Sequence, residues 1–366
     1  MTNDEYWFWL CNIEGIWQQD IKRILAAFKT PEEVYKAPDE LVAASGTLSP
    51  AQTQAMALSK KNPSALIKKQ EYLKKNKIRF IHADNPDFPE RLKYIPDAPY
   101  SFYLKGCLPD PQAPAAGIVG ARACSGYGKE MTLRFSSALA AKGVQIVSGM
   151  AHGIDACSAQ GALKAGGAPF AVLGSGVDVI YPKANTELYY NIILSGGVIS
   201  EYPPGTQPLS WQFPHRNRLI SGLSDIVLVM EARKRSGTLI TANCALEQGK
   251  EVFALPGRTD DPLSFGCNSL IADGAGVLLT PEGLLEHIFG VPFKEKAAAK
   301  DAFKNLKFPD PVYKKVFIKT CRHAKSVQNI ADESGCTATE AAAALTWLEI
   351  NGFVEEISAD YYIRLL

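Results

Sequence analysis

The sequence has no excess of charge of either sign and no long apolar run. Its 366 residues carry 39 Lys and Arg against 38 Asp and Glu, a net charge of +1. A general positive field for nucleic acid is therefore not indicated, and any site for a polyanion must come from local clusters. No run approaches the roughly 18 apolar residues of a membrane span, and Met1–Glu5 lacks the basic start of a signal peptide. We expect a cytoplasmic protein without membrane contact.

Cysteine patterns that would indicate a metal site or a disulfide framework are also missing. The sequence holds eight cysteines, but none are spaced as C-x-x-C and no His-x-x-x-His pair accompanies them. Zinc fingers and small disulfide-stapled domains depend on such spacings. We therefore expect free, buried thiols in a reducing cytosol and no bound metal ion.

Residues 1–80 are predicted to form a compact helical domain. Ile21, Ile24 and Phe28 recur at helical spacing. The module is similar to sterile-alpha-motif and helix-hairpin-helix bundles. A hairpin that binds phosphate usually has two glycines at its turn, whereas Ile13–Ile16 has one. This difference favours protein interaction over DNA binding for the domain.

One strongly basic stretch lies at the end of this domain. Between Lys60 and Arg79, eight cations stand against the single acid Glu71, which gives 8 − 1 = +7. Such a run is usually a solvated helix face. The alternative is a secondary track for nucleic acid, for which the candidate residues are Lys68, Lys69, Lys74 and Lys75.

The central part of the chain alternates between strands and helices. Residues 81–115 contain seven prolines, and we expect an irregular connector there. Over residues 116–290, short apolar runs without polar alternation predict strands buried on both faces. With amphipathic segments between them, they predict an extended Rossmann-like, doubly wound and mostly parallel α/β sheet. The predicted strands are Ala116–Gly120, Val144–Ser148, Phe170–Gly174, Val198–Ser200, Ile226–Met230, Val252–Leu255 and Gly276–Leu279.

A charged linker over residues 291–305 leads to a predicted winged-helix domain at 306–366. Its third helix begins at the capping box Thr337–Glu340 and ends near Gly352, before two strands. This helix contains no Lys or Arg, although phosphate neutralisation dominates DNA affinity. Protein contact or autoregulation is therefore favoured, and a transcriptional regulator that acts on duplex DNA is the alternative.

The first strand of the α/β domain leads into a turn suited to phosphate. Backbone N–H groups and the following helix dipole favour an anion there. The dinucleotide pattern G-x-G-x-x-G fails, however, because Arg122 and Ser125 occupy the second and third glycine positions after Gly120. A Walker lysine is also missing, so NAD and ATP are disfavoured and we expect no cofactor. Arg122 can donate two hydrogen bonds to a phosphate, and helix capping is its alternative role.

Three further strand ends are expected at the same edge of the sheet. Gly174–Gly176 forms a second glycine turn, and Ser236–Thr238 opens a helix after three basic residues. Arg216 and Arg218 are expected in the first turn of another helix, where cations oppose the macrodipole. An anionic ligand would explain their presence. The carboxyl ends of parallel strands form the crevice in which ligands bind in such sheets.

Taken together, these motifs resemble the DNA processing protein A (DprA, Smf) family over about 175 residues. The flanking helical and winged-helix parts extend the resemblance to nearly the whole chain. It implies a protein that binds and protects incoming single-stranded DNA, loads RecA recombinase during natural transformation and recombination, and forms a homodimer through the Rossmann-like domain. The motifs are Gly120-Ala-Arg122, Ser148-Gly-Met-Ala-His-Gly-Ile-Asp155, Gly174-Ser-Gly176, Phe213-Pro-His-Arg-Asn-Arg-Leu-Ile-Ser-Gly-Leu-Ser224, Ser236-Gly-Thr-Leu-Ile-Thr-Ala242 and Leu255-Pro-Gly257.

The resemblance also implies which residues bind DNA. Arg122 matches the arginine of the family's Gly-Ser-Arg turn, and Arg216–Arg218 matches its Phe-Pro-x-Arg-Asn-Arg element. Ala121 and Thr238 stand where serine is common, so the first loses a hydroxyl contact and the second keeps one. Trp211 and Phe213 are candidates to stack on bases, with core packing the alternative for Phe213. The predicted phosphate- and DNA-binding residues are Gly120, Arg122, Gly174, Ser175, Gly176, Arg216, Asn217, Arg218, Ser236, Gly237 and Thr238.

An enzyme on the same fold is the alternative function. The sheet also resembles that of phosphoribohydrolases of nucleoside monophosphates, which carry a Gly-Thr-x-x-Glu turn whose carboxylate assists cleavage. Here Thr241 occupies the place of that glutamate, which argues against hydrolysis. His152 and Asp155 could form a catalytic pair, but capping of the next helix is favoured. We therefore expect a binding protein and not an enzyme.

Overall fold

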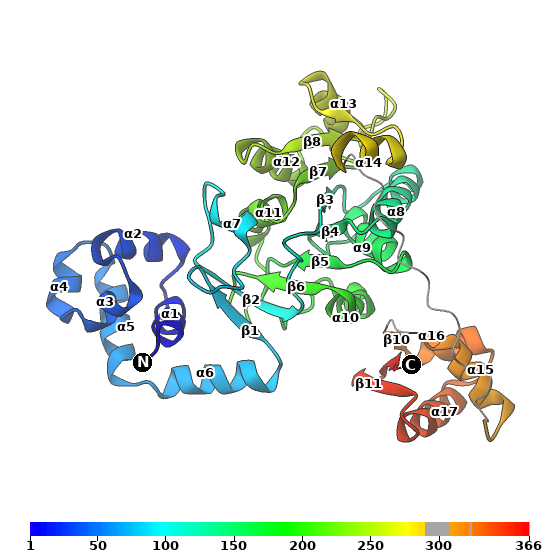
Figure 1. The fold of residues 1–366 in the computed structure, drawn as a ribbon, viewed down its shortest axis with the longest axis horizontal. Coiled ribbons are helices and arrows are strands. Elements are labelled where there is room, and N and C mark those ends of the chain that lie inside the picture. The colour runs from blue at the N-terminus through cyan, green and yellow to red at the C-terminus, as the bar shows by residue number, and fades with distance from the viewer. Residues whose placement is uncertain (290–307, 322–323, 366) are drawn as a thin grey trace.

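The computed structural model describes residues 1–289, 308–321 and 324–365 of the chain. At its centre is a nine-stranded sheet covered by helices, with a helical region before it and a small part of helices and antiparallel strands after it (Figure 1). The predicted α/β class with these two flanking parts is confirmed. No helix among the described residues has both the length and the apolar character needed to cross a membrane.

Six helices form the N-terminal region, and capping residues explain where several of them begin. Thr30 and Ser49 accept the backbone N–H groups of Glu33 and Gln52 at 3.2 and 3.3 Å. Large apolar side chains such as Trp9 pack in a shared core. The helices are α1 (Asn3–Cys11), α2 (Gln18–Phe28), α3 (Pro31–Lys36), α4 (Asp39–Ala44), α5 (Pro50–Lys61) and α6 (Ser64–Lys75).

The central sheet has the strand order β1-β2-β6-β5-β4-β3-β7-β8-β9. Neighbours from β6 to β9 are parallel, and nearly every residue of β3 to β8 is buried, as their apolar runs require. All the strands predicted over residues 116–290 form. They are β3 (Ala115–Val119), β4 (Gln145–Ser148), β5 (Pro169–Val172), β6 (Gly197–Ser200), β7 (Ile226–Val229), β8 (Glu251–Ala254) and β9 (Gly276–Val277).

The segment expected to be an irregular connector belongs to the sheet. It contains the second half of β1 (Arg79–His82), the short helix α7 (Glu90–Lys93) and β2 (Ser101–Gly106). β1 pairs antiparallel with β2, and β2 pairs antiparallel with β6, so the two strands extend one edge of the sheet. The prolines lie in the loops around these short elements rather than inside the strands, which corrects the expectation of an irregular chain.

Helices cover the two faces of the sheet in two groups (Figure 1). α8 (Gly126–Ala141), α9 (Ile154–Lys164), α10 (Thr186–Ser195) and α14 (Pro281–Phe289) lie on one face, and α11 (Gln212–Gly222), α12 (Gly237–Glu247) and α13 (Phe265–Ala272) lie on the other. The chain changes faces after β6, and the strand order reverses between β3 and β7. Such a reversal is where doubly wound sheets bind ligands.

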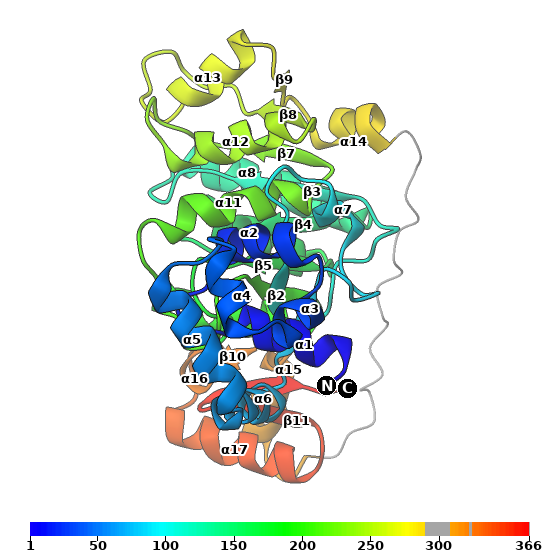
Figure 2. The same ribbon diagram turned by 90° about the vertical axis from the view of Figure 1, so that its left-hand side faces the viewer.

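The N-terminal helices lie beside the β1–β2 edge. Figure 2 looks onto these helices, with the sheet rising behind them towards β9. The indole Nε1 of Trp7 donates to Asp84 at 2.6 Å, and the hydroxyl of Tyr72 donates to Asp178 at 2.6 Å. These contacts, with an aromatic cluster around Phe80, join the helical region to the sheet.

The C-terminal part combines three helices with a three-stranded antiparallel sheet. Its elements are α15 (Pro311–Lys319), β10 (Lys325–Ser326), α16 (Val327–Ser334), α17 (Ala338–Ile350), β11 (Val354–Ser358) and β12 (Tyr361–Arg364). The predicted capping box is present, because Thr337 Oγ1 accepts the N–H of Glu340 and the Glu340 carboxylate accepts the N–H of Thr337. The predicted linker over residues 291–305 lies outside the described residues.

This C-terminal part contacts the sheet domain at α10. The side-chain amide of Asn191 donates to the carbonyl of Ala324 at 3.1 Å and accepts the N–H of the same residue. The hydroxyl of Tyr190 donates to Ser358 at 2.7 Å, and its ring lies 5.6 Å from that of Tyr361. Two adjacent residues of α10 therefore anchor the unit.

Candidate nucleic-acid interface

A cavity of about 290 Å³ lies at the carboxyl ends of β3 and β7, where the strand order reverses. We call it the switch-point cavity. Its walls come from the β3–α8 turn, the start of α9, one side of α11 and the start of α12. The predicted residues that line it are Gly120, Arg122, Arg216, Asn217, Ser236, Gly237 and Thr238.

The N-terminus of α12 opens into the switch-point cavity. Ser236 caps this helix by accepting the N–H of Thr238 at 3.2 Å. Space is open where a side chain would begin at Gly237, so a ligand can approach the backbone there. The helix dipole and the N–H groups of the first turn favour an anion at this position.

Arg122 offers a guanidinium group to the cavity. Its side chain is exposed and lies 5.1 Å over the ring of Phe213. Within the described ranges, no carboxylate lies within 4 Å of this guanidinium. A guanidinium group without an acidic partner can bind a phosphate in a bidentate manner. Arg233–Arg235, just before the start of α12, adds three exposed cations nearby in the chain.

Arg216 is buried below the cavity. Its Nη1 atom donates to the carbonyls of Gly149, at 3.0 Å, and Val172, and its Nε atom donates to Asn217 at 3.3 Å. Burial lowers the pKa of Arg216 to about 10, which leaves the group charged at neutral pH. Burial also raises the pKa of the neighbouring Asp155, and the charge of Arg216 opposes that shift.

Asp155 and Arg216 meet at Gly149, directly after β4. A Cβ atom on this glycine would lie 2.5 Å from Arg216 Nη2 and 2.6 Å from Asp155 Oδ2. Asp155 also accepts the N–H of Ala151 at 3.4 Å, near the start of α9. Ala151 precedes the N-cap residue Gly153, and α9 has no side-chain cap, so the capping role that the sequence favoured for Asp155 is not observed. The charged residues that line the cavity are two arginines and one aspartate, which gives 2 − 1 = +1.

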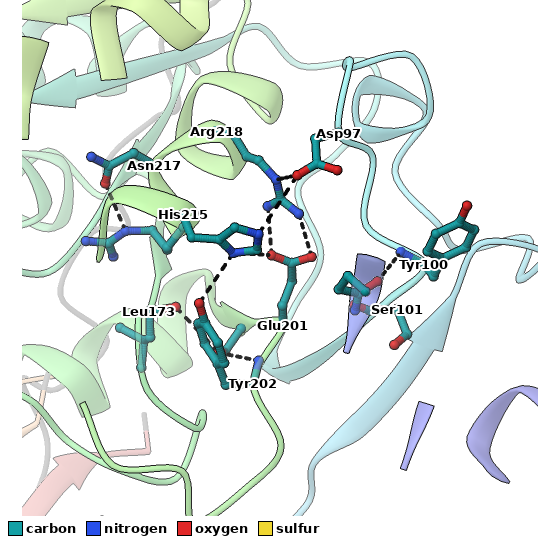
Figure 3. A network of polar contacts seen from close by, with 12 residues as sticks. Asp97, Tyr100, Ser101, Leu173, Glu201, Tyr202, His215, Asn217 and Arg218 are labelled. Carbon is teal, nitrogen blue, oxygen red and sulfur yellow. Dashed lines mark hydrogen bonds and ion pairs between the residues drawn. The ribbon is translucent and has the colours of Figure 1, made fainter. Parts of the chain in front are cut away.

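Arg218, a predicted phosphate-binding residue, does not line the cavity. Its guanidinium donates two hydrogen bonds of 2.7 Å to Glu201 and one of 3.1 Å to Asp97 (Figure 3). Burial opposes its charge, but the two carboxylates outweigh that effect and hold the pKa of Arg218 above its ordinary value. Arg218 thus ties α11 to the end of β6 and to the loop before β2.

The predicted second glycine turn also lies outside the cavity lining. Ser175 is buried, and its hydroxyl donates to the carbonyl of Val179 at 3.0 Å. The N–H of Gly176 donates to the carbonyl of Thr206 at 2.9 Å. A Cβ atom on Gly174 would lie 2.9 Å from the ring of Phe213. The turn therefore supports Phe213, whose ring in turn lies under Arg122.

The candidate lysines of the basic stretch lie on α6. Lys68, Lys69, Lys74 and Lys75 are exposed and do not line the switch-point cavity. Lys69 Nζ donates to the carbonyl of Asn12 at 2.9 Å, and partial burial lowers the pKa of Lys69. Their contact with DNA remains a prediction.

Two features of the cavity were not predicted from the sequence. Gly149 is the meeting point of two charged side chains, and its position after an apolar strand was the available signal. Thr241 lines the cavity, at the position where the hydrolase pattern has its glutamate. The one carboxylate among the described lining residues, on Asp155, is buried beside Arg216. Across the described chain, no cluster of three or more His, Cys, Asp or Glu could hold a metal ion.

Comparison with known proteins finds similarity over the sheet domain and beyond it. Residues 79–289 match the family model of DNA recombination-mediator protein A. Protein Smf of Escherichia coli K12 is 34% identical over 371 residues, covering 100% of this chain and 96% of that protein. The structure of DNA processing protein A from Streptococcus pneumoniae is 36% identical with a TM-score of 0.68, over 78% of this chain and 97% of that one. The structure of DNA processing protein A from Helicobacter pylori, which concerns its single-stranded-DNA binding mode, is 27% identical with a TM-score of 0.52. The match covers 58% of this chain and 96% of that one.

Proposed function

The chain belongs to the DNA recombination-mediator protein A family, and from that premise we propose that it binds single-stranded DNA at the switch-point cavity. The observation that carries the proposal is the exposed guanidinium of Arg122 beside the open N-terminus of α12. Both groups favour an anion, and buried Arg216 adds a positive charge beneath them. The single-stranded-DNA binding described for the Helicobacter pylori relative supports the same ligand.

The shape of the site favours a single strand over a duplex. A cavity of about 290 Å³ is at the small end of pockets that take small molecules. Proteins that read duplex DNA insert a helix or ribbon into a groove, whereas a concave pocket receives a flexible strand one nucleotide at a time. A phosphate on Arg122 and α12, with its sugar against Phe213, fits this arrangement.

Membership of the family supports a proposal for the biological role. We infer that the protein protects incoming single-stranded DNA and loads RecA recombinase onto it during natural transformation and recombination. A homodimer formed through the Rossmann-like domain would present two switch-point cavities. Two linked sites raise the overall affinity for one long strand without any new contact.

Fluorescence anisotropy with labelled oligo-dT and the matching duplex tests the site. Arg122→Ala removes a charge-assisted contact, so affinity for the single strand should fall roughly 10- to 100-fold. The slope of the logarithm of the binding constant against the logarithm of salt concentration should become shallower by about 0.7, which is the contribution of one phosphate contact. Arg134→Ala is the matched control, because Arg134 is exposed on α8 and lies outside the cavity lining. Equal affinity in the two variants would move the site away from the cavity.

A further inference from the structure

A second and larger cavity, of about 880 Å³, lies between the N-terminal helices and the sheet domain. We call it the tryptophan cavity, because Trp17 and Trp211 stand on its two sides. Trp17 precedes α2, and Trp211 precedes α11. Although both are large and apolar, they remain 50% and 53% exposed. Exposed aromatic residues that gather at one cavity mark a surface for a ligand.

The two tryptophan rings and the ring of Tyr202 contact one another edge to face. Trp17 and Trp211 have centroids 6.4 Å apart with planes at 89°, and Trp211 and Tyr202 have centroids 6.0 Å apart at 81°. The backbone N–H of Trp17 donates to Asp20 at 2.9 Å, which fixes the residue at the start of its helix. The perpendicular contacts hold the two indoles in place while about half of each remains open to a ligand.

The charges around the tryptophan cavity do not favour a phosphate site. Glu14, Asp20 and Glu201 line it, against the cations Lys69 and His215, the latter charged only when protonated. Arg218 pairs with Glu201 and Arg23 pairs with Asp20, so Glu14 and Lys69 are the remaining lining charges and they balance. A nucleobase is neutral and has a flat π-face, so it suits a cavity with aromatic walls and polar groups at its edges.

Helix α11 connects this cavity to the switch-point cavity. Trp211 and His215 line the tryptophan cavity, whereas Phe213 and Arg216 line the other. Trp211 and Arg216 are five positions apart in the sequence, which corresponds to roughly 8 Å along the axis of a helix. Nucleotides a few positions apart on one strand that crosses α11 can therefore reach both places.

We propose that Trp17 and Trp211 form a base-stacking site that extends the single-stranded-DNA site onto the N-terminal region. This inference rests on the proposed function. Phosphates bind at Arg122 and α12, and the bases of neighbouring nucleotides stack on the indoles. The N-terminal region then contributes directly to DNA binding through Trp17, with Lys69 of α6 in the lining of the same cavity.

The test compares oligo-dT with an oligomer of equal length whose nucleotides are abasic, on the full chain. The abasic strand keeps its phosphates and loses its stacking surfaces. Trp17→Ala should weaken binding of oligo-dT between about fivefold and about a hundredfold, the range for loss of one stacking contact, and leave the abasic strand unchanged. Trp17→Phe should recover most of the affinity. Tyr94→Ala is the control, because Tyr94 is 80% exposed and lines neither cavity.

If Trp17→Ala fails to fold, Trp17→Leu is the second variant, because leucine keeps apolar volume and removes the aromatic face. Unchanged oligo-dT affinity in a folded Trp17 variant would overturn the stacking site. Equal losses for oligo-dT and the abasic strand would also overturn it, because Trp17 would then only position the N-terminal region. If Arg122→Ala loses oligo-dT affinity and the Trp17 variants do not, the proposed function is supported and the stacking site is refuted. A wild-type chain that binds neither strand would refute both.

Discussion

The buried ion pair between Arg218 and Glu201 gives the sharpest prediction for stability. The Arg218 side chain is 9% exposed and the Glu201 side chain is 3% exposed, and two hydrogen bonds of 2.7 Å join them. Glu201→Gln keeps the shape of the partner but removes its charge. The arginine then stays buried with only Asp97, whose side chain is half exposed, to neutralise it.

The expected cost can be worked out from this arrangement. Removal of one partner from a buried pair usually destabilises a protein by about 3–5 kcal/mol. Asp97 still accepts from Arg218 at 3.1 Å, which places the cost near the lower end, at about 3 kcal/mol. For a folding unit of this size, that loss lowers the melting temperature by roughly 6 to 12 °C.

The assay is differential scanning calorimetry on the full chain. The affinity for single-stranded DNA is measured separately, well below the temperature of the unfolding transition. Glu201→Leu combined with Arg218→Met should be less destabilising than Glu201→Gln, because it removes both buried charges. Arg218→Met should leave the affinity of the folded protein for oligo-dT near that of the wild type. A melting temperature unchanged in Glu201→Gln would refute the argument from burial. A large affinity loss in folded Arg218→Met would restore Arg218 as a DNA ligand.

Three further changes test other parts of the structure. Gly149→Ala places a methyl group against Arg216 and should lower oligo-dT affinity roughly tenfold while the protein remains folded, as measured by anisotropy and circular dichroism. Asn191→Ala removes the two hydrogen bonds between Asn191 and Ala324, which are part of the contact between α10 and the C-terminal part, and faster limited proteolysis between the two parts should follow. Lys250→Met removes the ammonium group that donates to three carbonyls at the end of α11, and thermal unfolding should report a loss of about 1–3 kcal/mol.

Much of the fold could be predicted because its strands are local, apolar and separated by clear helix signals. The strand over Ala115–Val119 lies within one residue of its predicted position, and the capping box at Thr337 marks the start of α17. β1 and β2 were missed for a physical reason. β2 pairs with β6, almost a hundred residues away, and the prolines around it match those of a loop. Only the distant partner distinguishes this edge strand from an irregular segment.

The site was predictable as far as it depends on strand ends, since the turns after β3 and β7 meet where the strand order reverses. Its chemistry was harder to assign because a glycine turn can serve either a ligand or a neighbouring ring. Gly174 lies against Phe213, and the amide of Gly176 is already bonded to Thr206. No sequence pattern shows which backbone groups are already used in the fold.

The geometry of α11 explains why the two arginines of one motif have different roles. Residues two apart on a helix are turned by roughly 200°, so Arg216 and Arg218 must point to nearly opposite sides. Phe213 and Arg216 share one side, at the switch-point cavity, and Trp211 and His215 precede Arg218 at helical spacing on the other. A helix that served only a phosphate site would need just one of these faces. The second face carries the aromatic wall and the ion pair to the end of β6, and it therefore has a role separate from the phosphate site. The stacking and stability variants change this second face and leave the phosphate contacts intact.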